Sequence, residues 1–192
     1  MHSDEQLFTD GSDVSMTQLI GRYERPLYRF LVQMTGDAHL AEDLFQETFL
    51  RLHRSRGRFH VSLSLKAYLY TIALNAARDA LSSRTRTVTL DSGDEHASIE
   101  PADEADGPML ESQHAELRTG VRRALNRLPD AEREVVILRL YEGLSFAEIA
   151  QVTRVPLSTA KSRLLYALRR LRPALERFAS DSILEAKETC HE

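Results

Sequence analysis

LPDAEREVVILRLYEGLSFAEIAQVTRVPLSTAKSRLLYALRRLR, residues 128–172, contains three helix patterns separated by turns too short for anything but a helix-turn-helix. Gly143 can end one helix in the left-handed conformation, and Ser145 with Glu148 three residues later forms a capping box that begins the next. This second helix is short, because Pro156 disfavours helical conformation at the residue before it. The stretch therefore predicts a short helix, a tight turn and a new helix after the proline.

The helix that begins at Leu157 has the composition of a DNA-recognition helix. Small polar residues at its start leave room for a phosphate backbone, and basic and aromatic residues follow along its length. The alternative is an ordinary helical bundle whose arginines are only solvated, but the order of short helix, turn and basic helix favours DNA reading. The candidate DNA contacts are Ser158, Thr159, Lys161, Ser162, Arg163, Tyr166 and Arg169.

Composition indicates a globular protein that remains in the cytoplasm. The 192 residues, 42% of them hydrophobic, can form one domain or two small ones with packed cores. There is no apolar run of about 18 residues, and the beginning of the chain, MHSDEQLFTDGSD, is too acidic and polar for a signal peptide. The single cysteine, Cys190 beside His191, is a poor metal site, so we expect no metal and no cofactor.

The charges are distributed unevenly around a net charge of −4. Residues 117–178 hold 13 Lys and Arg against 6 Asp and Glu, whereas residues 87–116 hold 9 acidic residues and no Lys or Arg. Residues 1–86 are nearly balanced, with 11 basic and 10 acidic residues. The sequence therefore predicts two folded segments joined by an acidic linker.

The N-terminal half predicts three helices, so the expected fold is all-α. Apolar residues recur at three-four spacing over residues 14–34, Gly36 ends that helix, and Asp37 caps a second helix that continues to residue 54. A third helix covers residues 64–84. The inward positions of the second helix are Ala41, Leu44, Phe45, Thr48 and Leu52, and those of the third are Leu65, Tyr68, Leu69, Ile72, Ala73, Ala76 and Ala80.

Two polar surfaces accompany these helices. The second helix carries a mostly polar stripe, Asp43, Gln46, Glu47, Leu50 and Arg54, which by pattern alone is typical of a solvated helix face. The turn before the third helix and the helix itself mix cations with aromatic rings, a combination that suits single-stranded nucleic acid. Tyr68 is assigned to packing, and the pattern leaves Tyr70 undecided.

The segments AEDLFQETFLRL and YLYTIALNAARDAL, the acidic linker and the helix-turn-helix occur in one order in this chain. Together, over residues 14–172, they resemble the extracytoplasmic-function (ECF) sigma factors of the sigma-70 family. The resemblance implies two small helical domains. The expected segments are a flexible N-terminus (1–13), a sigma2-like bundle (14–86), an acidic flexible linker (87–110), a sigma4-like helix-turn-helix domain (111–178) and a tail (179–192).

The resemblance also implies partners. RNA polymerase core would dock its β′ clamp helices on the second helix, which replaces the solvated interpretation of that face, and its β flap on the C-terminal domain. Promoter DNA would be read as a single-stranded −10 element and a duplex −35 element, the latter by the recognition helix. An anti-sigma factor is a further candidate partner. The implied polymerase contacts are Asp43, Leu44, Gln46, Glu47 and Leu50, and the implied −10 contacts are Arg56, Arg58, Phe59, Tyr70, Asn75 and Arg78.

The chain departs from the family pattern at a few positions. Arg154 stands where the helix-turn-helix turn usually has glycine, and a left-handed conformation there costs about 1 kcal/mol. Ser158 and Ala160 replace a glycine and a β-branched residue in the recognition helix, Tyr68 replaces a tryptophan, and Leu65 replaces an aromatic residue. These differences bear on the promoter sequence rather than on the fold.

Two other functions fit the sequence less well. A two-domain helix-turn-helix regulator would show a receiver or ligand pocket before residue 86, and no alternating strand pattern with a following aspartate occurs there. An enzyme would show a phosphate-binding glycine loop, metal-ligand spacing or a nucleophile beside a base, and we find none. Whether the acidic linker occupies a basic channel of the polymerase or is a passive tether remains open.

Overall fold

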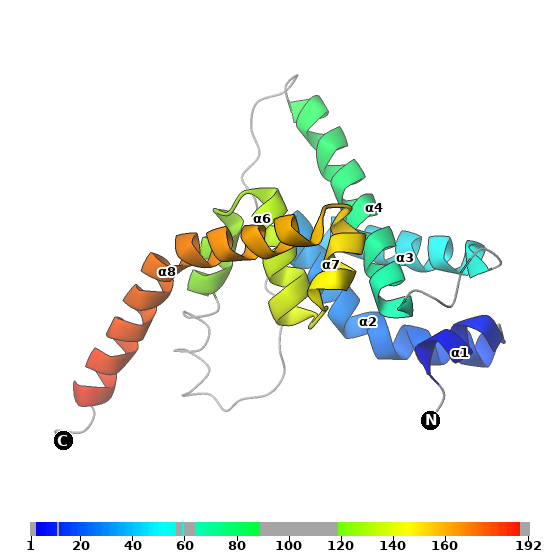
Figure 1. Cartoon of the computed structure of the whole chain (residues 1–192), viewed down its shortest axis with the longest axis horizontal. Helices are drawn as coiled ribbons and strands as arrows, with labels where there is room; N and C mark the ends of the chain where they lie inside the picture. Colours follow the sequence, from blue (N-terminus) through cyan, green and yellow to red (C-terminus); the bar gives the residue numbers. More distant parts are fainter. Residues whose placement is uncertain (1–2, 11, 57–58, 60–63, 89–118, 189–192) are drawn as a thin grey trace.

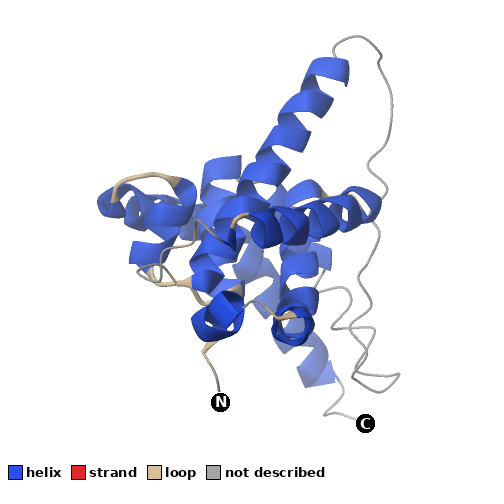
Figure 2. Cartoon of the chain, turned by 90° about the vertical axis from the view of Figure 1, so that its right-hand side faces the viewer, coloured by secondary structure: helices blue, strands red, loops and turns tan. Residues whose placement is uncertain are grey.

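The structure is a computed structural model that describes residues 3–10, 12–56, 59, 64–88 and 119–188. Within these ranges all regular elements are helices and no strand occurs (Figure 2). The all-α fold expected from the sequence is therefore confirmed. No helix in the described part of the chain is both long and apolar enough to cross a bilayer.

Three long helices build the N-terminal domain. They are α2 (Asp13–Thr35), α3 (Ala38–Arg54) and α4 (Leu65–Val88), and each packs against the other two. Gly36 ends α2 with a φ of 70°, and the Asp37 carboxylate caps α3 by accepting hydrogen bonds from two backbone amides of its first turn. Both boundaries lie where the sequence predicts them.

The N-terminal segment corrects one expectation. We expected residues 1–13 to be flexible, but Asp4–Asp10 form a helix, α1, that packs on α2 and α4. A helix of 7 residues is too short to be stable alone, so tertiary contacts must hold it. Leu7 and Phe8 supply them, because both side chains are buried in the core of the domain.

The C-terminal domain is a helix-turn-helix with two preceding helical segments. A helix over residues 119–126 precedes α6 (Asp130–Val136), which continues as a π-helical turn, η2 (Ile137–Tyr141). Then follow α7 (Phe146–Thr153) and α8 (Leu157–Glu188). The helix α8 thus extends well into the segment from residue 179 that was expected to be a tail.

The turns of this domain have the predicted chemistry. Gly143 has a φ of 67°, and Ser145 and Glu148 form the complete capping box at the start of α7. Arg154 ends α7 in the left-handed conformation, with φ 58° and ψ 44°. Within the described residues it is the one non-glycine residue with a positive φ.

The two domains share a hydrophobic core. Side chains of α1 to α4 form one continuous buried cluster with residues of α6, η2, α7 and the start of α8, and α7 lies directly on α4 (Figure 1). The sequence predicted two domains and a linker, but it did not predict this contact. The linker residues 89–118 lie outside the described residues. The buried C-terminal members of the shared core are Val135, Ile137, Leu138, Leu144, Ile149, Val152 and Ala160.

Candidate functional site

The expected polymerase-docking face lies on the outer side of α3. Asp43 and Gln46 are exposed, and so is Leu50, at 50%. Glu47 is half-buried and accepts a hydrogen bond from Arg51 Nε at 2.6 Å. Leu44 differs from the others because it is buried, so it supports this face from the core side rather than belonging to its surface.

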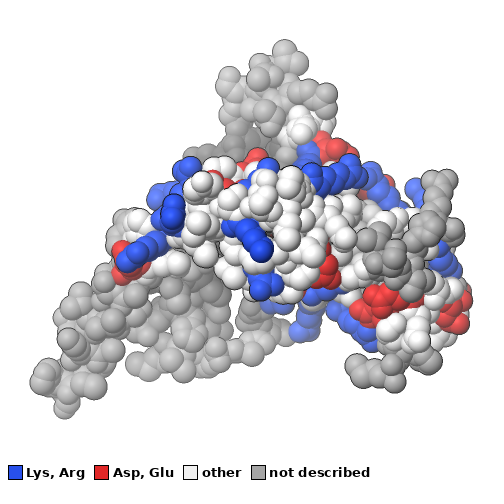
Figure 3. Space-filling view, viewed as in Figure 1, with Lys and Arg blue, Asp and Glu red and all other residues white. Residues whose placement is uncertain are grey.

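The expected −35 contacts lie on the solvent side of α8. Residues 158, 162, 166 and 169 follow one another at steps of three or four, so their side chains share one helix face. The opposite side of the helix is buried through Ala160, Ala167 and Leu171. Lys and Arg side chains recur along α8 in the space-filling view, with few acidic side chains beside them (Figure 3). Ser158, Lys161, Tyr166 and Arg169 are exposed, and Thr159, Ser162 and Arg163 are half-buried.

Lys161 is positioned by an aromatic ring from α7. Its Nζ atom lies 5.9 Å from the ring centroid of Phe146, and the Arg139 guanidinium lies 5.1 Å from the same centroid. Two cations near one aromatic ring are each attracted by its quadrupole. The arrangement places positive charge at the junction of the two helices of the helix-turn-helix.

The expected −10 contacts are less accessible. Phe59 and Arg56 in the connection between α3 and α4 are half-buried, and so are Asn75 and Arg78 on α4. Arg58 lies outside the described residues. Tyr70, which the sequence left undecided, is fully buried at 0% exposure. In this arrangement Tyr70 is therefore a core residue that DNA cannot reach.

Two carboxylates of the C-terminal domain bind two of these −10 candidates, Arg78 and Tyr70. Glu134 of α6 accepts hydrogen bonds from Arg78 Nε at 2.7 Å and from Arg78 Nη2 at 2.5 Å. Glu142, which follows η2, accepts a hydrogen bond from the Tyr70 hydroxyl, and its backbone carbonyl accepts one from Lys66 Nζ. The part of α4 that carries Lys66, Tyr70 and Arg78 is thus in contact with the C-terminal domain.

The interface changes the acidity of the groups it buries. Burial and the adjacent Glu142 carboxylate raise the pKa of Tyr70, so the phenol keeps its proton and donates it. Burial raises the pKa of Glu142, although the Tyr70 hydrogen bond and the positive charges of Lys66 and Arg29 oppose the shift. The hydrogen bond to Glu134 raises the pKa of Arg78, which stays charged.

Sequence reasoning missed Glu134, Glu142 and Lys66. A signal for their role exists in α4, where Tyr70 and Leu74 form a second apolar stripe besides the one assigned to the core. A helix that is apolar on two sides is buried on two sides. Both side chains are fully buried, and the Tyr70 hydroxyl bonds to Glu142 of the C-terminal domain.

The described residues include no group of three or more His, Cys, Asp or Glu side chains placed to hold a metal ion. Cys190 and His191, which the sequence made a poor metal site, lie outside the described residues. The site is therefore described by its charges, its aromatic rings and its helix faces.

Comparisons with known proteins match both halves of the chain. The family described as Sigma-70 region 2 matches residues 19–87, and the family described as Sigma-70, region 4 matches residues 118–171. RNA polymerase sigma factor CarQ of Myxococcus xanthus is 34% identical, over 88% of this chain and 93% of that protein. ECF RNA polymerase sigma factor EcfG of Rhodopseudomonas palustris is 32% identical, over 83% and 87%.

The chain belongs to the ECF sigma factors of the sigma-70 family. The fold agrees, because the sigma factor RpoE of Bartonella quintana, solved in complex with the anti-sigma factor NepR, superposes with a TM-score of 0.70. That match has 26% identity and covers 83% of this chain and 96% of RpoE. The resemblance seen in the sequence is therefore confirmed.

The ECF sigma factor binds core RNA polymerase and directs promoter-specific initiation, recognising the −35 element and melting the −10 element. Its docking and −10 candidates fall within the region 2 match, and its −35 candidates fall within the region 4 match. Helix α1 precedes the first match, and the second half of α8 follows the second.

Proposed function

We propose that this sigma factor binds polymerase through the exposed face of α3, opens and reads the −10 element with α4 and the connection before it, and reads the −35 element with α8. The observation that carries the proposal is the separation of the three faces on three helices. Each face is made of side chains suited to its partner; those of α3 and α8 are largely exposed, whereas Tyr70 and Arg78 of α4 contact the C-terminal domain.

The docking assignment is supported by the exposed Leu50 beside Asp43 and Gln46. A partner that covers this face would remove Leu50 from water, and the polar side chains around it would fix the orientation of the partner. The β′ clamp helices are the proposed partner of this face, and the β flap is the proposed partner of the C-terminal domain.

In the structure the C-terminal domain lies on α4, an arrangement that we call closed. Promoter opening requires this closed arrangement to change. Arg78 is paired with Glu134 and Tyr70 is covered, so neither can meet an unpaired strand while α7 lies on α4. We infer that the C-terminal domain leaves α4 when the two domains bind their separate sites on polymerase and promoter. This sigma factor would act in the cytoplasm, where polymerase and promoter DNA are. Its function needs no catalytic step by this chain.

An anti-sigma factor is a proposed regulator. The support is that RpoE, which shares the fold, was solved with the anti-sigma factor NepR. A non-sigma helix-turn-helix regulator is the less favoured alternative, because it gives no reason for a polymerase-docking face on α3.

The test uses Asn75, which is half-buried on α4 and whose amide can bond to a base edge. Holoenzyme is assembled with Asn75→Ala on a promoter selected from a randomised library by transcription. We expect unchanged core binding, permanganate reactivity of unpaired thymines reduced about tenfold, and partial recovery on a premelted template. Wild-type reactivity on the duplex promoter would mean that Asn75 is structural and that α4 does not read the −10 element.

A further inference from the structure

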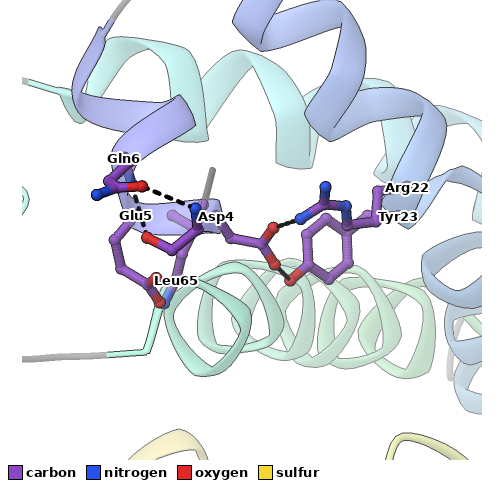
Figure 4. A network of polar contacts seen from close by, with 7 residues as sticks. Asp4, Glu5, Gln6, Arg22, Tyr23 and Leu65 are labelled. Atoms are coloured by element: carbon purple, nitrogen blue, oxygen red, sulfur yellow. Dashed lines mark hydrogen bonds and ion pairs between the residues drawn. The ribbon is translucent and has the colours of Figure 1, made fainter. Parts of the chain in front are cut away.

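Helix α1 lies before the region 2 match, yet its side chains contact two parts of the proposed −10 reader. It is anchored to α2 by Asp4, whose carboxylate accepts hydrogen bonds from Arg22 and from the Tyr23 hydroxyl (Figure 4). Burial of Tyr23 at this contact raises its pKa to about 12, so the phenol remains a donor. The anchor leaves the adjacent side of α1 free to contact α4 and the connection before it.

Glu5 contacts the beginning of α4. Its Oε1 atom accepts a hydrogen bond at 3.1 Å from the backbone amide of Leu65, the first residue of that helix (Figure 4 labels both residues). The first amides of a helix have no partner within it, and a carboxylate there also complements the helix dipole. The Ser64 hydroxyl accepts from the Ala67 amide, so α4 has a local cap, and Glu5 adds a second one from far along the chain.

The pKa of Glu5 agrees with this role. Hydrogen bonds from its own backbone amide and from that of Leu65 lower its pKa, so the carboxylate is charged at neutral pH.

Phe8 contacts the connection between α3 and α4. Its ring is fully buried and meets the Phe59 ring edge-on, with 5.2 Å between the ring centroids. Phe59 in turn lies 5.4 Å from the ring of Tyr68 on α4. Three aromatic rings in series therefore link α1 to the segment between α3 and α4, and that segment to α4. Aromatic pairs of this geometry are directional as well as apolar, so they fix the orientation of the rings.

We propose that Glu5 and Phe8 are positioning residues for −10 recognition, with α1 holding the start of α4 and Phe59 in the geometry that meets the unpaired strand. The proposal rests on the proposed function of α4. A reader held in place before binding loses less conformational entropy when the strand arrives, so it discriminates between bases more strongly than a mobile one.

The test measures discrimination rather than activity. Holoenzyme containing Glu5→Gln or Phe8→Leu is bound to two premelted templates, one with the selected −10 sequence and one with a substituted −10 base. We expect the ratio of the two affinities to fall about three- to tenfold, because Glu5→Gln removes the negative charge at the start of α4 and Phe8→Leu removes an aromatic pair. A smaller fraction of folded protein would lower the apparent affinities for both templates by the same factor and leave their ratio unchanged.

Two comparisons sharpen the test. Asp13→Asn removes one carboxylate charge from an exposed position on the neighbouring helix α2, and it should keep the wild-type ratio. A Phe8→Leu, Phe59→Leu double variant should lose no more discrimination than Phe59→Leu alone, because Phe8 acts through Phe59. Fully additive losses would contradict the route from Phe8 through Phe59.

The outcome separates this inference from the proposed function. If Asn75→Ala loses discrimination while Glu5→Gln and Phe8→Leu keep the wild-type ratio, α1 is only structural and the inference is overturned. If Asn75→Ala also keeps the ratio, the assignment of α4 to the −10 element fails and the role of α1 falls with it. A ratio lowered by the α1 variants, with core affinity unchanged, supports the proposal.

Discussion

Arg154 shows how a single residue tolerates an unfavourable conformation. Its backbone is left-handed, yet its amide donates to carbonyls of α7 and its side chain is exposed. The tight turn that joins α7 and α8 uses this geometry, because a left-handed residue changes the direction of the chain directly after the helix. The turn is therefore kept at a cost of about 1 kcal/mol for the side chain at this position.

Arg154→Gly should stabilise the protein by about 0.5 kcal/mol, because the relieved strain exceeds the entropy that glycine adds to the unfolded chain. Gln151→Gly is the matched control, since Gln151 is exposed in the interior of α7 and glycine there should destabilise by about 1 kcal/mol. Thermal unfolding of both variants checks the two signs. Destabilisation by Arg154→Gly would show that the arginine side chain makes a compensating contact.

Lys161 is the residue at which phosphate and base contacts can be separated. It lies beside Phe146 at the edge of the reading face, a place suited to the DNA backbone. Lys161→Ala should weaken binding to all promoter sequences about equally and lower the salt slope by about one. The control is Arg172→Ala, which removes the same charge from the same helix where Arg172 is paired with Glu176. A changed preference at one base pair would instead assign Lys161 to base reading.

At the scale of the element, α3 presents one side to the core and the other to a partner. Asp43→Ala with Gln46→Ala should weaken core polymerase binding about thirtyfold if each side chain contributes about 1 kcal/mol, since about 1.4 kcal/mol corresponds to a factor of ten. Thermal stability should stay unchanged, since both side chains are exposed. Glu24→Ala, which removes an exposed carboxylate from the neighbouring helix α2, serves as the control. Equal core affinity for all three proteins in a titration would remove α3 as the docking face.

The elements differ in how far sequence predicts them. The capping box at Ser145 and the end of α2 at Gly36 follow from local chemistry, whereas the left-handed Arg154 was expected from the family resemblance, and all three are present. Helix α1 was missed because its stability comes from Leu7 and Phe8 contacting distant helices, which leaves no local periodicity in 7 residues.

The candidate site, like the helices, could be predicted where local sequence decides it and not where distant contacts decide it. The outer faces of α3 and α8 are exposed as the pattern indicates, because amphipathic spacing alone decides which side of a helix meets water. The burial of Tyr70 was not predictable in this way, since its partner Glu142 is remote in sequence. A domain contact depends on the complementarity of two whole surfaces, which no window of sequence contains.

At the scale of the whole molecule, the interface between the domains carries two buried carboxylates whose charges have opposite effects on closure. Glu134 is satisfied by the guanidinium of Arg78, so its charge favours closure. Glu142 has a raised pKa, so its charge opposes closure. For a carboxyl group with a raised pKa the closed form binds protons more tightly, and closure therefore weakens as pH rises from about 4.5 toward the raised value.

The same substitution at the two positions should thus have opposite effects. Glu134→Gln leaves the Arg78 cation without its counter-charge and should open the molecule, whereas Glu142→Gln can still accept from Tyr70 and should close it further at neutral pH. Small-angle scattering at pH 7 checks both expectations. Relative to the wild type, the radius of gyration should be larger for Glu134→Gln and smaller or equal for Glu142→Gln. Glu142→Gln should also abolish the pH dependence of the radius. Identical radii for both variants would contradict the charge assignment.

Because the two domains share a core, the activity of this sigma factor depends on the fraction of molecules in the open form. If one molecule in about a hundred is open, a partner that needs the open form binds about a hundredfold more weakly than its contacts alone allow. Substitutions that loosen the packing of α7 on α4 would then increase transcription without touching polymerase or DNA. A screen for hyperactive variants should recover positions hidden between those two helices, at sites that an inventory of contacts would class as purely structural.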